Sequence, residues 1–229
     1  MNPHDPYAWN AVINGKQITL LFHTYNVMIT HGMANVVSDQ IKLLDGFHGK
    51  NYPLTVTRGK IHECLGMTID FRNKWIIAFL QHDAIKKFWR SLPPELKGPC
   101  RSTPAPVNLF KVDSESPRVD SNLQEKHHAA TAKSLWFSQR SRTDPQISTG
   151  FHCTRVREMS DQDVAKFRHL SGRLWLTRCL PLMISMHEDG EVCAHVDSAH
   201  AAHAGGRGHS GLCLTIGSRG MINASKSWD

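Results

Sequence analysis

The sequence has no long apolar run, no leader-like N-terminus and no paired cysteine motif, and each absence excludes a class of protein. No apolar stretch reaches the roughly 18 residues that a membrane-spanning helix needs. The first residues carry neither the basic nor the apolar segment of a secretory signal peptide. The six cysteines form no C-x-x-C pair, which favours reduced thiols over a disulfide framework or a zinc module. We therefore expect a cytoplasmic or nuclear protein that is not secreted and does not engage a membrane.

The composition is that of a basic globular protein. Hydrophobic residues make up 40% of the chain, enough to bury a core, and the formal net charge is +7. Lysine and arginine supply most of the non-specific affinity of proteins for nucleic acid, because they contact phosphates. The basic residues are spread along the chain, so an ordinary basic surface explains the charge equally well.

The first part of the chain predicts two β-hairpins, each followed by a helix. Asn14-Gly15 tolerates the positive φ angles of a type I′ turn, so a hairpin is expected around it. Val37, Ile41 and Leu44 recur at helical spacing. In chain order, the predicted elements are a hairpin within 8–30, a helix over 33–47, strands over 61–71 and 75–80, and a helix over 82–91.

A proline-rich connector over 93–122 precedes a helical segment, because its prolines exclude a helix interior or a central strand. Helices are predicted over 124–142, over 144–156 and from 160 onwards. Asp144 is expected as an N-cap with Pro145 at the first helical position. Ser160 and Asp163 predict a capping pair at the start of the last helix. The apolar stripe of that helix is Val164, Phe167, Leu170 and Leu174.

After Pro181 the pattern changes to short strands, predicted over 182–186, 191–196, 211–216 and 220–224, with a turn at 187–190. A small sheet without a covering helix leaves apolar faces and strand edges exposed. The fold class is therefore α+β, and the chain divides into segments 1–92, 93–122, 123–180 and 181–229.

Several stretches, taken in order, resemble the polymerase of copia-type retrotransposons, whose polyprotein joins a reverse transcriptase to a ribonuclease H. Lys60–Phe71 resembles the family's K-x-H-x-Y-L-G-M-x-x-D-[YF] strand, and Val196–His203 resembles the first strand of its ribonuclease H. Further similar stretches are Trp9–Lys16, Thr103–Ala105, Leu109–Phe110, Ser141–Asp144, Phe151–Val156 and Gly208–Gly211. The resemblance covers nearly the whole chain. It implies partial reverse-transcriptase palm hairpins with connecting, thumb-like helices, followed by an incomplete ribonuclease H-like sheet.

The departures from the family predict a loss of polymerase activity. In the family, the first hairpin leads to a turn with two adjacent aspartates that help to hold the catalytic Mg²⁺ ions. Tyr25 and Asn26 stand in their place here, and a phenol and an amide cannot replace two carboxylates. A third aspartate of the family would lie before Met1. We therefore expect no cofactor in this chain, although intact family members use Mg²⁺.

The ribonuclease H portion is expected to be equally inactive. Asp197 matches the first metal-binding aspartate of that domain, while the other carboxylates of the family would lie beyond Asp229. One carboxylate cannot hold a two-metal site. Asp197 is then a vestige, or alternatively a surface aspartate at the end of a strand.

Two functional hypotheses follow, neither of them an enzyme. The first is a degenerate copia-type retrotransposon fragment. The alternative is a non-catalytic nucleic-acid-binding protein derived from the retroelement, which binds an RNA/DNA duplex weakly and in a salt-dependent way. Its candidate binding residues are Arg140, Arg142, Arg155, Arg157, Arg168 and Arg173. A third option, an active element completed by carboxylates from another chain, conflicts with Tyr25 and Asn26 at the centre of the palm.

Two other groups of residues have a plain explanation beside the functional one. The tail is rich in histidine and cysteine, but its spacing lacks the tight pairs of a zinc site, so we expect no metal centre. Four tryptophans could stack on bases, as in single-strand binders, but we expect them to pack in the core. They are Trp75, Trp89, Trp136 and Trp175.

Overall fold

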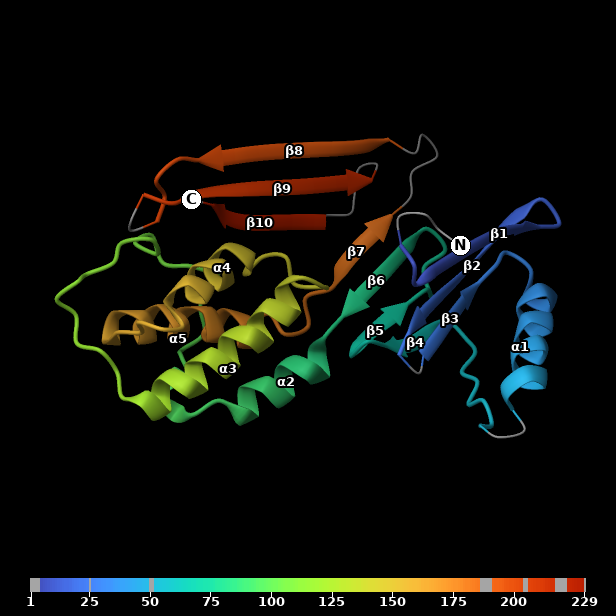
Figure 1. Ribbon diagram of the computed structural model, residues 1–229, viewed down its shortest axis with the longest axis horizontal. Coiled ribbons are helices and arrows are strands. Elements are labelled where there is room, and N and C mark those ends of the chain that lie inside the picture. The colour runs from blue at the N-terminus through green and yellow to red at the C-terminus, as the bar shows by residue number, and fades with distance from the viewer. Residues whose placement is uncertain are drawn as a thin grey trace. The chain divides into compact units, whose positions relative to one another are not determined.

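The described residues of the computed structural model are 5–24, 26–49, 52–185, 191–203, 206–216 and 222–228. They form five α-helices and three small antiparallel sheets (Figure 1). The chain divides into two compact units, residues 1–58 and residues 59–229. The mixed α+β class expected from the sequence is confirmed at this level.

The first unit contains a three-stranded sheet and one helix. Its elements are β1 (Ala8–Ile13), β2 (Lys16–His23), β3 (Asn26–Thr30) and α1 (Ala34–His48). Asn14 and Gly15, with φ angles of 51° and 72°, form the two-residue turn between β1 and β2. Positive φ at both positions is typical of the predicted hairpin turn. The helix predicted over 33–47 is confirmed as α1.

The core of the first unit is small, because part of the apolar face of its sheet remains uncovered. Alternate residues of a strand share a face, so Phe22 lies on the same face as Leu20. Trp9 pairs with Leu20, and Val27 pairs with Phe22. Trp9, Phe22 and Val27 are nevertheless exposed. The buried core consists of Ile18, Leu20 and Val36.

The second unit begins with a sheet in the order β4-β5-β6-β7. Its strands are β4 (Ile61–Cys64), β5 (Met67–Asp70), β6 (Ile76–Leu80) and β7 (Leu182–Ser185). The prediction of one strand over 61–71 is wrong. Leu65 and Gly66, with φ angles of 54° and 69°, close a tight turn between β4 and β5. Positive φ is rare for leucine, so the sequence does not signal this turn.

Strand β7 completes the sheet that β4 begins. It pairs antiparallel with β6, from Phe79 opposite Leu182 to Ile76 opposite Ser185. The sequence places 182–186 with the later strands, but its partner is β6. Residues 81–181, which contain four of the helices, therefore lie between two neighbouring strands of one sheet.

Four helices of the second unit share one apolar core. They are α2 (His82–Ser91), α3 (Ser121–Ser138), α4 (Gln146–Arg155) and α5 (Asp161–Leu176), and a short 3₁₀ turn spans Pro94–Leu96. Phe88 of α2 packs edge to face on Phe137 of α3. Phe167, Leu170 and Leu174 are fully buried, which confirms the predicted stripe of α5.

The start of α5 matches the prediction, whereas the start of α4 does not. The backbone N–H of Ser160 donates to Asp163 Oδ2 at 3.0 Å, as expected of a capping pair. Asp144 does not cap α4, since Pro145 occupies the N-cap position without a side-chain bond. The carboxylate of Asp144 instead accepts charge-assisted bonds from Arg142 and Arg173.

The predicted core position of Trp75 is also wrong. Trp75 precedes β6 and is 62% exposed, with Lys74 Nζ 5.1 Å from its ring centre. The other three tryptophans of that prediction are partly buried. Trp89 stacks on Trp175 with ring centres 5.2 Å apart, and Trp136 packs against the helical core.

Helix α5 packs directly on the backbone that follows the 3₁₀ turn. A Cβ on Gly172 would lie 1.9 Å from the carbonyl oxygen of Pro99, so only glycine fits there. Ser171 fixes the same contact, because its hydroxyl donates to the carbonyl oxygen of Leu96 at 2.7 Å. The connector is therefore held tightly at its beginning.

The third sheet has the order β10-β9-β8. Its strands are β8 (Val192–Ala199), β9 (Gly208–Ile216) and β10 (Ile222–Trp228), and α4 lies beside β10 (Figure 1). The predicted turn at 187–190 lies outside the described residues. Among the described residues, no helix is long and apolar enough to cross a membrane.

Candidate functional site

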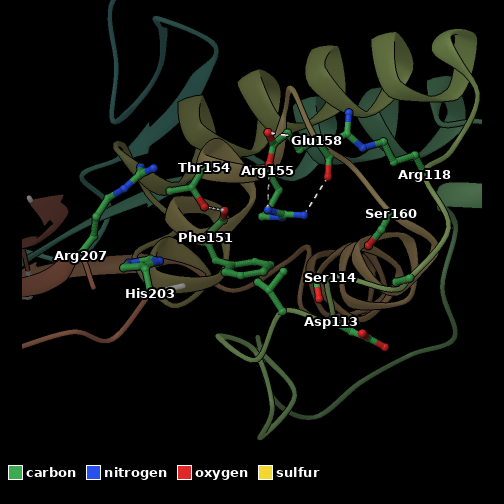
Figure 2. A pocket seen from close by; sticks show the side chains of 12 residues that line it. Asp113, Ser114, Arg118, Phe151, Thr154, Arg155, Glu158, Ser160, His203 and Arg207 are labelled. Atoms are coloured by element: carbon green, nitrogen blue, oxygen red, sulfur yellow. Dashed lines mark hydrogen bonds and ion pairs between the residues drawn. The ribbon is translucent and has the colours of Figure 1, made fainter. Parts of the chain in front are cut away.

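A cavity of about 430 Å³ in the second unit is lined mainly by polar and charged side chains (Figure 2). The connector, the end of α4, the start of α5 and the loop before β9 all contribute to it. Figure 2 shows His203 and Arg207 on one side of Phe151 and Arg118 on the other. The charged lining residues are Asp113, Arg118, Arg155, Glu158 and Arg207.

Arg155 is held firmly in the wall of this cavity. Its Nε donates to Asp163 Oδ2 at 3.1 Å, and its Nη2 donates to the carbonyl oxygen of Glu158 at 2.8 Å. Arg118 Nη2 lies 4.0 Å from Glu158 Oε1 (Figure 2). An incoming anion would therefore compete with Glu158 and Asp163 for these guanidinium groups.

His203 meets His209 at the same cavity. His203 Nε2 lies 3.0 Å from His209 Nδ1, and the ring of Phe110 packs edge-on against His203. Burial lowers the pKa of both histidines, and the neighbouring His209 and Arg207 lower the pKa of His203 further. Both rings are therefore neutral near pH 7, and one donates to the other.

Two of the six predicted binding arginines are bound to one carboxylate inside the fold. Arg142, whose side chain is 1% exposed, donates from Nε and Nη2 to Asp144, with both distances 2.9 Å. Its guanidinium also donates to the carbonyl oxygen of Thr177 at 3.1 Å. Arg173 Nε donates to Asp144 Oδ2 at 3.2 Å, the same oxygen that accepts from Arg142 Nη2. Arg142 and Arg173 thus tie the start of α4 to the end of α5 instead of facing solvent.

The remaining predicted arginines lie at different places in the second unit. Arg155 lines the cavity described above. The guanidinium of Arg140 lies 5.0 Å from the ring centre of Trp136. Arg157 and Arg168 are exposed. The nucleic-acid-binding prediction therefore depends chiefly on Arg157 and Arg168.

The positions predicted to be catalytic vestiges are only partly described. Tyr25 lies outside the described residues, while Asn26 is the first residue of β3 and is exposed beside the β2–β3 turn. Asp197 is exposed in β8, opposite Gly211 of β9. Among the described residues, no group of three or more histidine, cysteine, aspartate or glutamate side chains could hold a metal ion.

A buried histidine pair is the site feature that sequence reasoning missed. His127 of α3 and His152 of α4 are both fully buried, and His127 Nε2 lies 3.2 Å from His152 Nδ1. Burial lowers the pKa of His127 to about 4, and burial and the neighbouring His127 lower the pKa of His152 well below its usual value. The pair carries no motif, because its partners come from separate helices.

Comparison with protein-family models, with curated proteins and with solved structures found no match to this chain.

Proposed function

We propose that the chain is a degenerate fragment of a copia-type retrotransposon reverse transcriptase and ribonuclease H that no longer catalyses RNA-directed DNA polymerisation. The observation that carries this proposal is the β2–β3 hairpin. Asn26 begins β3 and pairs with His23 of β2, and the resemblance matches this position to one of two adjacent aspartates of the family. A neutral amide does not neutralise the charge of the Mg²⁺ ions that nucleotide addition requires.

The order of the elements supports the same proposal. The stretch Lys60–Phe71, which resembles a family strand, contains the whole β4–β5 hairpin. The stretches that resemble ribonuclease H lie largely in β8 and β9, which pair with each other. Asp197 is the vestige of its metal site in this view. A single exposed carboxylate gives no two-metal centre, so we propose that hydrolysis is lost as well.

Primer extension and ribonuclease H assays on the purified chain test this proposal. With Mg²⁺, a primed RNA template and all four nucleotides, we expect no product, whereas an intact reverse transcriptase in parallel extends the primer. A product that depends on Mg²⁺ and disappears on chelation would refute the proposal.

A second candidate function is binding of an RNA/DNA duplex without catalysis, which the exposure of Arg157 and Arg168 favours. Duplex affinity measured by fluorescence anisotropy should fall steeply with salt, because bound phosphates release counterions. Replacing both arginines by alanine should reduce the salt slope by about 2, or about 1 for each lost contact. Lys42→Ala, at an exposed lysine of the first unit, is the matched control. No binding at low salt would exclude this candidate.

A further inference from the structure

The fold brings an exposed thiol against an imidazole at the surface of the second unit. Cys179 Sγ lies 3.2 Å from His82 Nδ1, although the two residues are 97 positions apart in the sequence. Cys179 is exposed, and His82 is partly exposed. When the ring of His82 carries its proton on Nε2, Nδ1 can accept the proton of the thiol.

The His82 side of this pair is held by buried contacts. His82 is the first residue of α2, directly after Gln81, which is 2% exposed. Gln81 Oε1 accepts bonds from the hydroxyl of Ser141 at 2.7 Å and from its backbone N–H at 3.3 Å. Because Gln81 is fixed, the backbone at the start of α2, which carries His82, is fixed as well.

The Cys179 side is held on both flanks. Two residues before it, Thr177 accepts bonds from the buried Arg142, at its carbonyl oxygen and at its hydroxyl. Three residues after it, Leu182 pairs with Phe79 where β7 meets β6. The stacking of Trp89 on Trp175 joins α2 to α5 nearby. The thiol–imidazole contact is therefore a product of the packed fold and not of two mobile side chains.

Three other cysteines differ from Cys179 in accessibility or in partner. Cys100 and Cys193 are also exposed, but among the described residues no imidazole lies within hydrogen-bond distance of either thiol. Cys153 is partly buried, and burial raises the pKa of its thiol, which disfavours the reactive thiolate. Cys179 alone of these four combines access to solvent with a base in contact.

We propose that Cys179 is a site of reversible modification by small disulfides, with His82 as the base that activates it. His82 Nδ1 takes the Sγ–H proton, and the thiolate attacks one sulfur of a disulfide R–S–S–R. A bond forms between Cys179 Sγ and that sulfur while the original S–S bond breaks. The departing thiolate takes the proton from the imidazolium. Cysteine is oxidised and the disulfide is reduced, so no further oxidant is needed.

The first test compares thiols within the intact chain, so it needs no variant. The folded protein reacts briefly with 5,5′-dithiobis(2-nitrobenzoate) or with glutathione disulfide at pH 7, and peptide mass spectrometry then measures the modified fraction of each cysteine. Cys179 should react about 10- to 100-fold faster than Cys100, because a positioned base assists it. Equal rates for Cys179 and Cys100 would overturn the proposal.

Variants then assign the base. His82→Ala should slow the reaction of Cys179 about tenfold or more, and added imidazole should restore part of the rate, which loss of a purely structural contact would not allow. Cys100→Ser is the control that leaves the fast reaction unchanged, and circular dichroism checks that each variant is folded. A fast reaction that persists in Cys179→Ser, or that is unaffected by His82→Ala, would contradict the proposal.

Discussion

The two compact units of the chain differ in how completely they bury apolar surface. The first unit has a core of three buried residues and leaves Trp9, Phe22 and Val27 exposed on the same face of its sheet. The helical part of the second unit buries ten residues in one continuous core. Since apolar burial provides most of the favourable free energy of folding, the helical core should hold most of the stability.

This difference shows that similar local patterns do not give similar stability. Both units begin with hairpins that lead into helices, and both have glycine in their tight turns. In the second unit, α3, α4 and α5 pack against one another and cover their apolar faces. We therefore expect the amide protons of the first unit to exchange much faster than those of the helical core.

The largest expected effect comes from opening the helical core. Phe167 is fully buried and packs edge-on against the rings of His127 and His152. Phe167→Ala should reduce the unfolding free energy of the second unit by about 4 kcal/mol, because a buried cavity replaces the ring. Urea titration followed by hydrogen exchange gives the loss for each unit. Leu20→Ala is the corresponding core substitution in the first unit. If either variant lowers the unfolding free energy of both units equally, the two units do not differ in stability as proposed.

Acid should weaken the second unit through its buried histidines. The pKa of His127 is lowered to about 4, chiefly by burial; Asp163 opposes this shift and His128 adds to it. The unfolded chain, with an ordinary pKa near 6.5, then binds more protons than the folded one. Neutral His127 makes its full contribution to the free energy of unfolding above about pH 6.5. This contribution is lost as the pH falls towards 4, which lowers the free energy of unfolding by about 3 kcal/mol.

Urea midpoints between pH 7.5 and 4.5 measure this loss. His127→Gln, which cannot titrate, should show a shallower decline over that range than the wild-type chain. If the urea midpoints of the variant and of the wild-type chain decline equally with pH, protonation of His127 is not the cause of the acid destabilisation. Each unit should be followed separately, so that acid effects in the first unit are not attributed to the second.

A smaller loss is expected where α5 meets the connector. Gly172→Ala places a methyl group against the carbonyl oxygen of Pro99, which cannot move without breaking the contact of α5 with that segment. We expect a loss of about 2 kcal/mol from overpacking, measured as a shift of the urea midpoint. An unchanged urea midpoint would mean that the connector backbone moves away from the added methyl group with little loss of stability.

The smallest change should stabilise the weaker unit. Gly46 lies inside α1, and a Cβ there meets nothing within 4 Å. Gly46→Ala should therefore slow hydrogen exchange in the first unit, with a gain of about 0.5–1 kcal/mol, because alanine loses less backbone entropy in a helix. Exchange in the helical core should stay unchanged, and a change there would show that the two units are coupled.

Local signals in the sequence predicted those elements that are stabilised by their own residues. Asn14-Gly15 and the Ser160–Asp163 pair are such cases, because the turn and the cap are made within a few residues. Leu65 escaped prediction because its positive φ is imposed by the sheet on both sides of the turn. Asp144 failed as a cap because two arginines, one of them 29 positions away, bind its carboxylate more strongly than a helix start can.

The candidate site was harder to predict than the fold. Arg142 and Arg157 look alike in the sequence, yet one is buried against Asp144 and Thr177 while the other faces solvent. The contact between Cys179 and His82 depends on the pairing of β6 with β7, which no local pattern indicates. Residue type suggests possible chemistry here, whereas the partners that decide it come from distant segments.

The pairing of β6 with β7 also bears on how the chain is made. A ribosome releases β6 first and must add the whole helical segment before β7 emerges. At typical rates of synthesis, this interval lasts roughly 5–20 s. During that time the free edge of β6 can pair with other extended chains. Early folding of the helices while the chain is still being translated would shorten the search for β7, because it brings the two ends of the segment together.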